Sequence, residues 1–211
     1  MQINITTFAG RKHHYIQQTL QSLFSSNGLD THLPVNLIVG SEDESHLQEY
    51  ATQPAVRIIS WDIETNSNLR WNCTLNKIRA LRYGDGEPTL VCEDDILFKP
   101  HWLAALAAAT ASISDEEYIM SLYTDPTVIA RAPAAPGTRF VKRYPTFDLV
   151  GAQALFYPTK ALRSKVADYL QKNLIRATGD NLIGQYARAH AELYATEDPL
   201  VENIGWISCF Q

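Results

Sequence analysis

Several features that define common protein classes are scarce or missing in this sequence. Its 211 residues include three cysteines, and the wide spacing of Cys73, Cys92 and Cys209 is unlike a disulfide framework or a zinc site. No stretch is long and apolar enough to predict a membrane span, and no charged leader with a long apolar segment opens the chain. Lys and Arg number 18 against 23 Asp and Glu, which argues against bulk binding to nucleic acid or to an anionic membrane. We therefore expect a cytoplasmic protein with reduced thiols.

The composition that is present is that of a globular protein. Hydrophobic residues make up 45% of the chain and charged residues 19%, both ordinary values for folded domains. The length is sufficient to bury a substantial core. Because the sequence shows no repeat, linker or low-complexity segment, we predict one domain over residues 1–211.

Apolar runs typical of strands alternate with stretches in which apolar residues recur at helical spacing. In the first hundred residues we expect strands at residues 1–8, 35–40, 56–61 and 89–92, helices at 14–24 and 68–83, and a helix start at 41–44. In the remainder we expect helices at residues 101–113, 158–170 and 181–190, strands at 118–123, 193–195 and 200–204, and a proline-rich loop at 124–139. This order, with short connections, predicts the α/β class, with a Rossmann-like, mostly parallel central sheet flanked by helices.

Three consecutive carboxylates, Glu93, Asp94 and Asp95, interrupt the apolar run of residues 89–98, TLVCEDDILF. They follow a predicted buried strand, at the end where open α/β sheets bind ligands. Adjacent carboxylates repel one another and are costly to bury unpaired, so a divalent cation or Arg and Lys side chains should accompany them. A solvated acidic turn is the alternative. The apolar residues 96–98 that follow at once favour a metal or ligand site.

The ends of the predicted strands resemble, in their order along the chain, the nucleotide-sugar-binding half of the GT-A glycosyltransferases. The segment LVCEDDILF resembles the DxD-type motif of that family in the form Glu-Asp-Asp. Residues 150–154 resemble its acceptor-side strand, residues 179–181 the acidic motif that opens a late helix, and residues 199–205 a C-terminal segment of some branch-adding N-acetylglucosaminyltransferases and small bacterial relatives. The resemblance covers residues 2–205. It implies a single GT-A-like domain, whose residues 1–100 bind the nucleotide sugar and whose residues 101–211 bind the acceptor.

The resemblance implies a metal-assisted reaction. Asp95 would ligate Mn²⁺ or Mg²⁺, which bridges the donor diphosphate. Many metal-dependent members carry a histidine near the C-terminus that completes the shell of the ion. This chain has Asn203 there, a weaker ligand through its carbonyl oxygen. The departure keeps open a catalytically inactive nucleotide- or carbohydrate-binding module of the same fold.

Further residues are implied to contact the nucleotide-sugar donor. Thr6, Thr7 and Arg11 would border the base, and Glu93 would face the ribose or the water shell of the metal. The full set implied to line this pocket is Thr6, Thr7, Arg11, Asp43, Asp62, Arg70, Asn72, Asn76, Lys77, Glu93 and Asp94. For the residues of the predicted helix at 68–83, a solvated helix face is the alternative.

The implied activity is that of a hexosyltransferase. It moves a sugar from a nucleotide-diphosphate sugar, expected to be a UDP-sugar, to a hydroxyl acceptor. Transfer with inversion needs a carboxylate that takes the proton of the acceptor hydroxyl, and Asp180 is the candidate. Gly-Asp-Asn at a helix start is also an ordinary N-cap arrangement, and both interpretations stay open.

The acceptor is less defined by the sequence. Arg139, Lys142 and Arg143 follow the proline-rich loop, either as a solvated strand edge or as a groove that neutralises phosphate on the donor or on an anionic acceptor. A glycan or a lipid-linked sugar is the expected acceptor, and nucleic acid is the less favoured one. A sugar-phosphate nucleotidyltransferase is the competing enzyme class, but residues 8–12 supply only a fragment of the glycine-rich first loop which that family needs.

Overall fold

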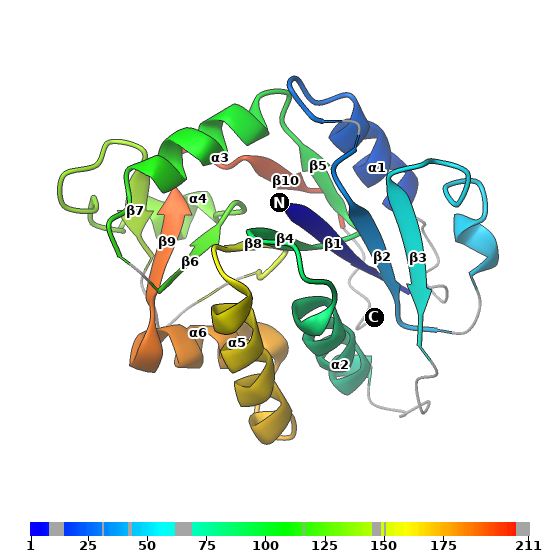
Figure 1. Ribbon diagram of the computed structural model, residues 1–211. Coiled ribbons are helices and arrows are strands. Elements are labelled where there is room, and N and C mark those ends of the chain that lie inside the picture. The colour runs from blue at the N-terminus through cyan, green and yellow to red at the C-terminus, as the bar shows by residue number, and fades with distance from the viewer. Residues whose placement is uncertain are drawn as a thin grey trace.

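A computed structural model describes residues 1–8, 15–30, 32–41, 44–61, 69–115, 117–144, 149 and 151–205 (Figure 1). Its strands are β1 (Gln2–Thr7), β2 (Val35–Val39), β3 (Val56–Ser60), β4 (Thr89–Glu93), β5 (Ile96–Phe98), β6 (Tyr118–Ser121), β7 (Val141–Arg143), β8 (Ala154–Tyr157), β9 (Glu192–Thr196) and β10 (Val201–Asn203). Its helices are α1 (Ile16–Phe24), the 3₁₀ helix η1 (Ser45–Leu47), α2 (Leu69–Arg82), α3 (Trp102–Ala111), α4 (Pro126–Ile129), α5 (Lys160–Asn173) and α6 (Gly179–His190). None of the described helices is long and apolar enough to cross a bilayer.

The described strands form a central eight-stranded sheet in the order β3-β2-β1-β4-β8-β6-β9-β7. The strands β3, β2, β1 and β4 pair in parallel, as do β6 and β9. β8 is antiparallel to both of its neighbours, β4 and β6, and β7 is antiparallel to β9. The strands β1, β4, β6 and β9 therefore run in one direction and end at the same edge of the sheet. The predicted α/β class with a flanked, mostly parallel sheet is confirmed.

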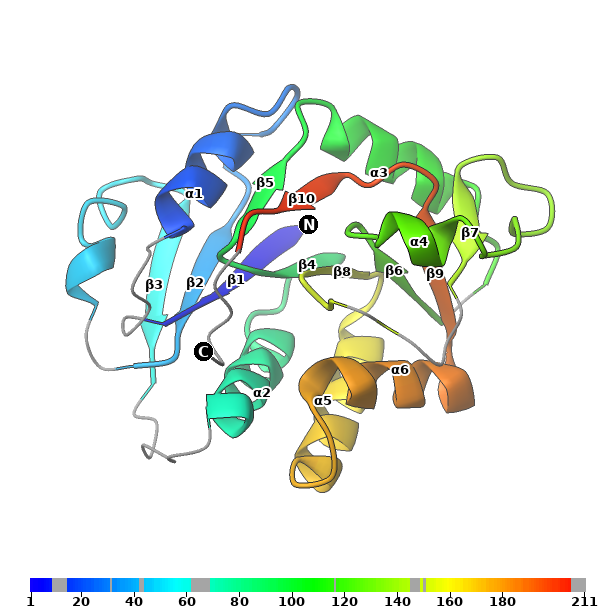
Figure 2. The ribbon, with the colours of Figure 1, turned by 180° about the vertical axis from the view of Figure 1, so that it is seen from behind.

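Helices cover both faces of this sheet (Figures 1 and 2). α1 and α3 lie on one face together with β5 and β10, and α2, α5 and α6 lie on the other. Alternate residues of β4 enter the two cores, because Leu90 and Cys92 pack on the first side and Val91 packs on the second. Burial on both faces explains why this strand is a continuous apolar run in the sequence.

Several predicted elements need correction at their ends. The apolar run around the acidic triplet is two strands, since β5 leaves the main sheet and pairs antiparallel with β10. The helix expected from residue 158 begins after Thr159, whose hydroxyl accepts a hydrogen bond from the backbone N–H of Leu162 at 3.2 Å. In place of a helix starting at residues 41–44 the chain forms η1, and the proline-rich loop contains α4.

The thiols that the structure describes are reduced. Cys92 is buried in the core and Cys73 is half-buried on α2, and neither of the two forms a disulfide. Burial, followed by the neighbouring carboxylates, raises the pKa of the Cys92 thiol well above its usual value. Cys92 thus has the character of an inert core residue, as expected, whereas Cys209 lies outside the described residues.

Candidate functional site

The acidic corner, formed by Glu93, Asp94 and Asp95, joins the end of β4 to the start of β5. α1 holds this corner from one side. The hydroxyl of Thr19 lies 2.7 Å from the carbonyl oxygens of both Asp94 and Ile96, and it accepts from the backbone N–H of Ile96 at 3.3 Å. Because the backbone turns here between two sheets, the three carboxylates face different directions and have different partners.

Asp94 points into the protein. Its side chain is buried, and its Oδ2 accepts a hydrogen bond of 2.5 Å from the hydroxyl of Thr7, which is buried at the end of β1. The hydroxyl of Thr6 donates to the carbonyl of Cys92 at 3.3 Å. The donor contacts expected of Thr6, Thr7 and Asp94 remain predictions, but the polar groups of these side chains tie β1 to β4 and to the acidic corner.

Asp95 lies beneath the segment that follows β10. Its carbonyl oxygen accepts from the backbone N–H of Ile204 at 2.8 Å, and a Cβ atom placed on Gly205 would come within 2.1 Å of its Oδ2. The Oδ1 of Asn203 accepts from the backbone N–H of Gly205 at 2.7 Å. The structure therefore brings the segments of Asp95 and Asn203 together, as their proposed joint role at a metal requires.

The oxygen atoms that the protein offers to a hard cation form a complete metal site only if oxygen atoms of the substrate add to them. Within the described ranges, no group of three or more His, Cys, Asp and Glu side chains could hold a metal ion by itself. Asp95 offers a carboxylate, and the Asn203 carbonyl keeps one lone pair beyond its bond to Gly205. Oxygen ligands of this kind, supplemented by diphosphate oxygens, match the preferences of Mg²⁺ and Mn²⁺.

Glu93 belongs to a second arrangement, the Lys77 bridge, which consists of Lys77, Glu93 and Asp180. The Nζ of Lys77 donates to Glu93 Oε1 at 3.1 Å, to Asp180 Oδ1 at 3.0 Å and to the carbonyl of Ala152 at 3.3 Å. Lys77 is buried, whereas the side chains of Glu93 and Asp180 are 32% and 33% exposed. A buried ammonium on α2 thus joins a carboxylate at the end of β4 to one in the first turn of α6.

In the bridge the ammonium attracts both carboxylates, whereas the carboxylates repel each other. Burial alone would lower the pKa of Lys77, but the carboxylates of Asp180 and Glu93 outweigh it and raise this pKa above its ordinary value. Burial raises the pKa of Glu93; Lys77 opposes this shift, and Asp95 and Asp180 add to it. At neutral pH the bridge therefore contains a firmly protonated lysine.

The packing of α6 against α2 makes the bridge possible. A Cβ atom on Gly179 would lie 3.4 Å from the hydroxyl of Thr74 and 3.6 Å from Cδ of Lys77, which are ordinary contact distances, so the start of α6 packs directly on α2. The N-cap of α6 is Thr178, and Asp180 lies in the first turn rather than at the cap. The negative charge of the Asp180 carboxylate is favourable near the positive end of the helix dipole. Asp180 is therefore not the N-cap residue, which was the alternative to a catalytic role.

The other residues predicted to contact the nucleotide-sugar donor either hold the scaffold together or lie outside the description. Asn76 is buried, and its Nδ2 donates to the carbonyls of Thr7 at 3.3 Å and Ile38 at 3.0 Å, so it connects the ends of β1 and β2. Arg70 lies in the first turn of α2, and its side chain is outside the description. The predicted residues Arg11, Asp43 and Asp62 lie outside the described residues altogether.

Two members of the basic cluster after the proline-rich loop are paired with acids. Lys142 lies 3.6 Å from Glu197, and Arg143 lies 3.4 Å from Glu192. Arg139 stacks over the ring of Phe140 with its guanidinium carbon 4.9 Å from the ring centroid. The described part of the cluster is thus closer to a neutralised strand edge than to a phosphate groove.

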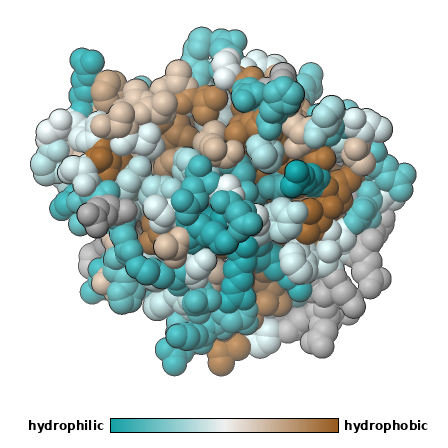
Figure 3. Space-filling model, in the orientation of Figure 1, coloured by the Kyte–Doolittle hydropathy of each residue, from teal (hydrophilic) through white to brown (hydrophobic). Residues whose placement is uncertain are grey.

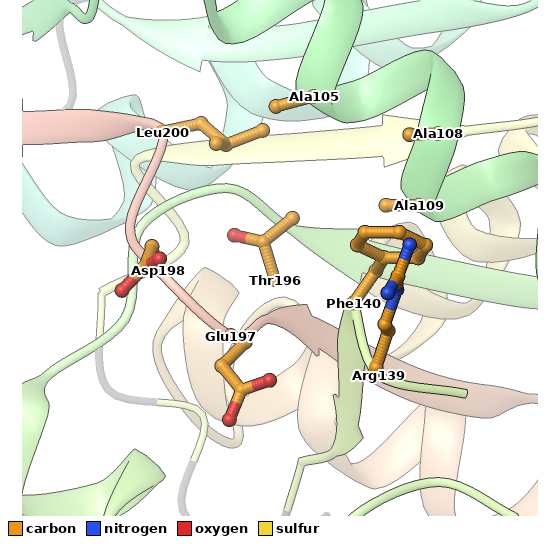
Figure 4. Close-up of a pocket in the computed structure, with 9 residues that line it drawn as sticks. All are labelled: Ala105, Ala108, Ala109, Arg139, Phe140, Thr196, Glu197, Asp198 and Leu200. Carbon is orange, nitrogen blue, oxygen red and sulfur yellow. The ribbon is translucent and has the colours of Figure 1, made fainter.

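Arg139 and Phe140 also line a separate cavity, here called the α3 cavity, of about 370 Å³ (Figure 4). Its walls come from α3, from the approach to β7 and from the end of β9. The lining residues are Ala105, Ala108, Ala109, Arg139, Phe140, Thr196, Glu197, Asp198 and Leu200.

Solved structures share this fold, although no protein-family model and no curated protein matches the chain. The crystal structure of S. aureus TarS 1-349 superposes with a TM-score of 0.61 at 17% identity, covering 94% of this chain and 58% of that one. The same fragment in complex with UDP-GlcNAc gives 0.61 at 15% identity, with 99% and 62% covered. The galactosyltransferase LgtC, solved with donor and acceptor sugar analogs, gives 0.54 at 13% identity, with 88% and 70% covered.

The glycosyltransferase GlyE of Streptococcus pneumoniae TIGR4 is also similar, with a TM-score of 0.52 at 13% identity over 91% of this chain and 45% of that one. This chain therefore spans less than two thirds of the TarS fragment and about half of GlyE. At these identities the likeness establishes the fold, which is that of GT-A-like glycosyltransferases.

Proposed function

We propose that the chain is a glycosyltransferase that moves a sugar from a nucleotide-diphosphate sugar, a UDP-sugar in the first instance, to a hydroxyl acceptor with inversion. The observation that carries the proposal is the Lys77 bridge. It joins a carboxylate of the acidic corner to Asp180 at the carboxyl edge of a sheet where α/β proteins bind ligands. The fold supports it, because the similar structures include one solved in complex with UDP-GlcNAc and one solved in complex with donor and acceptor sugar analogs.

Asp95 and Asn203 would hold a divalent cation, Mn²⁺ or Mg²⁺, on the donor side of the site. Bound there with the diphosphate, the cation would neutralise charge on the leaving group. The protein supplies the placement, because Ile204 and Gly205 hold the segment after β10 against Asp95. Glu93 lies at the other end of the acidic corner. Its side chain is 32% exposed, so it could contact the nucleotide-sugar donor while it is bonded to Lys77.

Asp180 would take the proton from the acceptor hydroxyl. Its Oδ1 and Glu93 Oε1 are bonded to the same nitrogen at 3.0 and 3.1 Å, so the base and the donor-side carboxylate are immediate neighbours. Inverting transfer requires this proximity, since the hydroxyl must be deprotonated as it attacks the anomeric carbon. Lys77 serves as a positioning residue, because it sets the side chain of Asp180 relative to the acidic corner.

The test compares Asp180→Asn with the wild type. The amide oxygen can still accept from Lys77, so binding of UDP with Mn²⁺, measured by calorimetry, should change by less than about threefold, while transfer should fall by about a hundredfold or more for loss of a general base. Asp168→Asn is the matched control, because Asp168 is an exposed helix residue paired only to Arg82 among the described residues. Near-normal transfer by Asp180→Asn would place the base elsewhere or indicate a retaining reaction.

One observation favours a second candidate, an inactive binding module of the same fold. Asn203 stands where metal-dependent members carry a histidine, and its oxygen already bonds the backbone of Gly205. Such a module would bind a UDP-sugar without hydrolysing or transferring it, with or without Mn²⁺. A nucleotidyltransferase would instead release pyrophosphate from UTP and a sugar 1-phosphate, which we expect not to occur.

A further inference from the structure

The connection between α5 and α6 projects from the body of the molecule. It forms the lower end of the protein in both ribbon views, on the far side of α5 from the sheet (Figures 1 and 2). α5 ends at Asn173, and α6 begins at Gly179 after its N-cap Thr178. We call residues 172–177 the α5–α6 tip. A projecting segment of this kind can meet a flat surface before the rest of the molecule does.

Local contacts hold the α5–α6 tip in one shape. The backbone carbonyl of Asn173 accepts from the N–H of Arg176 at 2.8 Å, and its Oδ1 accepts from the guanidinium of Arg176 at 3.0 Å. Its Nδ2 donates to the carbonyl of Tyr169 at 2.9 Å. Leu174 and Ala177 pack against the core on the side of α2, α5 and α6. The side chains between these two anchors therefore point outward.

Ile175 is the apolar side chain that the tip presents to solvent. It is 74% exposed, whereas the other large apolar side chains that the structure describes as exposed, Phe140 and Trp61, are 39% and 36% exposed. A single apolar side chain on a surface is common, but this one stands at the end of a projecting segment. Figure 3 shows a small hydrophobic area bordered by hydrophilic ones at this end of the molecule.

Two exposed cations flank this isoleucine. Lys172 and Arg176 are exposed, and neither forms an ion pair with a carboxylate among the residues that the structure describes. The nearest preceding acid in the sequence, Asp168, is paired with Arg82. Residues 169–179 contain no Asp or Glu, although the whole chain has a net charge of -5. The α5–α6 tip is thus a positive site on an acidic protein.

We propose that the α5–α6 tip docks the protein reversibly on a membrane surface that contains anionic phospholipids. Ile175 enters the boundary between headgroups and acyl chains, while Lys172 and Arg176 contact lipid phosphates. The acidic remainder of the protein is repelled by the same surface, so it turns the tip toward the lipid. A nucleic acid would bind the two cations but would offer no apolar layer to the isoleucine.

Docking would bring the proposed transfer site close to the lipid. Asp180 follows Ile175 by five residues, and an extended chain covers about 3.5 Å per residue, so the two residues are at most about 18 Å apart. An acceptor anchored in the membrane would then be within reach of Asp180. This consequence rests on the proposed function, whereas the docking itself does not.

Co-sedimentation with lipid vesicles tests the docking. Vesicles of phosphatidylcholine with about 30% phosphatidylglycerol would be compared with pure phosphatidylcholine, at about 0.1 M and about 0.5 M NaCl. The tip variants are Ile175→Ser and the double variant Lys172→Gln with Arg176→Gln. The matched control is Arg57→Gln with Arg131→Gln, which removes the same charge from two exposed positions on other parts of the chain.

We expect the wild type to bind the anionic vesicles and to bind them more weakly at high salt. Each cation near an anionic surface raises the partition about fivefold, so the double tip variant should bind about 25-fold more weakly. Ile175→Ser should bind at least about fivefold more weakly, and the control should stay within about twofold of the wild type.

The proposal is overturned if the wild type does not bind the anionic vesicles, or binds neutral vesicles equally well. Unchanged binding by either tip variant, an equal loss in the control, or tip-dependent binding of a short DNA duplex in place of vesicles would overturn it as well. Calorimetry of UDP with Mn²⁺ in solution should give the same affinity for all variants. Absence of UDP binding in every protein, with tip-dependent vesicle binding intact, would refute the proposed function and leave the docking standing.

Discussion

Lys77→Met tests whether the buried ammonium organises the site. Methionine keeps an unbranched stem of similar length, so packing near Thr74 and Gly179 is largely preserved. What is lost is the positive charge between Glu93 and Asp180. The substitution therefore leaves two carboxylates close together, with Asp95 nearby and no cation between them.

The size of the effect follows from the contacts. Two hydrogen bonds between charged groups contribute about 1.5–3 kcal/mol each, and breaking a fully buried pair costs about 3–5 kcal/mol. Because Glu93 and Asp180 are about one-third exposed, water can solvate part of their charge, and the methionine carries no desolvation cost of an ammonium. We expect a net loss of about 2–4 kcal/mol in the free energy of unfolding.

Urea unfolding at neutral pH would measure this loss. Arg82→Met is the matched control on the same helix, because its partner Asp168 is 62% exposed, and an exposed pair contributes no more than about 1 kcal/mol. Glu93→Gln should cost less in the Lys77→Met protein than in the wild type, by about 1 kcal/mol or more, since it then removes a repelled charge. A Lys77→Met protein as stable as the control, or additive double-mutant energies, would refute the reasoning.

Three further perturbations probe the neighbouring contacts. Thr7→Val removes the bond to the buried carboxylate of Asp94 and should cost about 1–3 kcal/mol in urea unfolding; an unchanged midpoint would contradict it. Gly205→Ala places a methyl group against Asp95, so calorimetry should show at least about tenfold weaker binding of UDP with Mn²⁺, unless the segment after β10 is no part of the site. Hydrogen bonds from the first turn of α4 lower the pKa of Asp125, so its contribution to stability is present above pH about 3.9 and is lost as the pH falls through the lowered native value. Amide exchange of α4 in acid should follow this titration, and Asp125→Asn should abolish the dependence.

The sequence by itself determined the alternation of strands and helices and the place of the acidic corner. These are local properties. The run of residues 89–92 is apolar because β4 is buried on both faces, and the charges of residues 93–95 mark where it leaves the sheet. The resemblance to GT-A glycosyltransferases rested on this local pattern, and the solved structures confirm the fold that it implied.

Only the tertiary structure decided how the polar residues divide between scaffold and site. From the sequence, Lys77 could lie on a solvated helix face or in the pocket. In the structure it is buried, because α6 places Asp180, which is 103 positions away in the sequence, next to its ammonium group. Asp94, equivalent to its neighbours in the sequence, turns inward to Thr7. The antiparallel insertion of β8 was likewise unforeseen. The reason is common to all three: the partner of a buried charge or of a strand is chosen by packing between distant segments, which leaves no periodic signal in either segment alone.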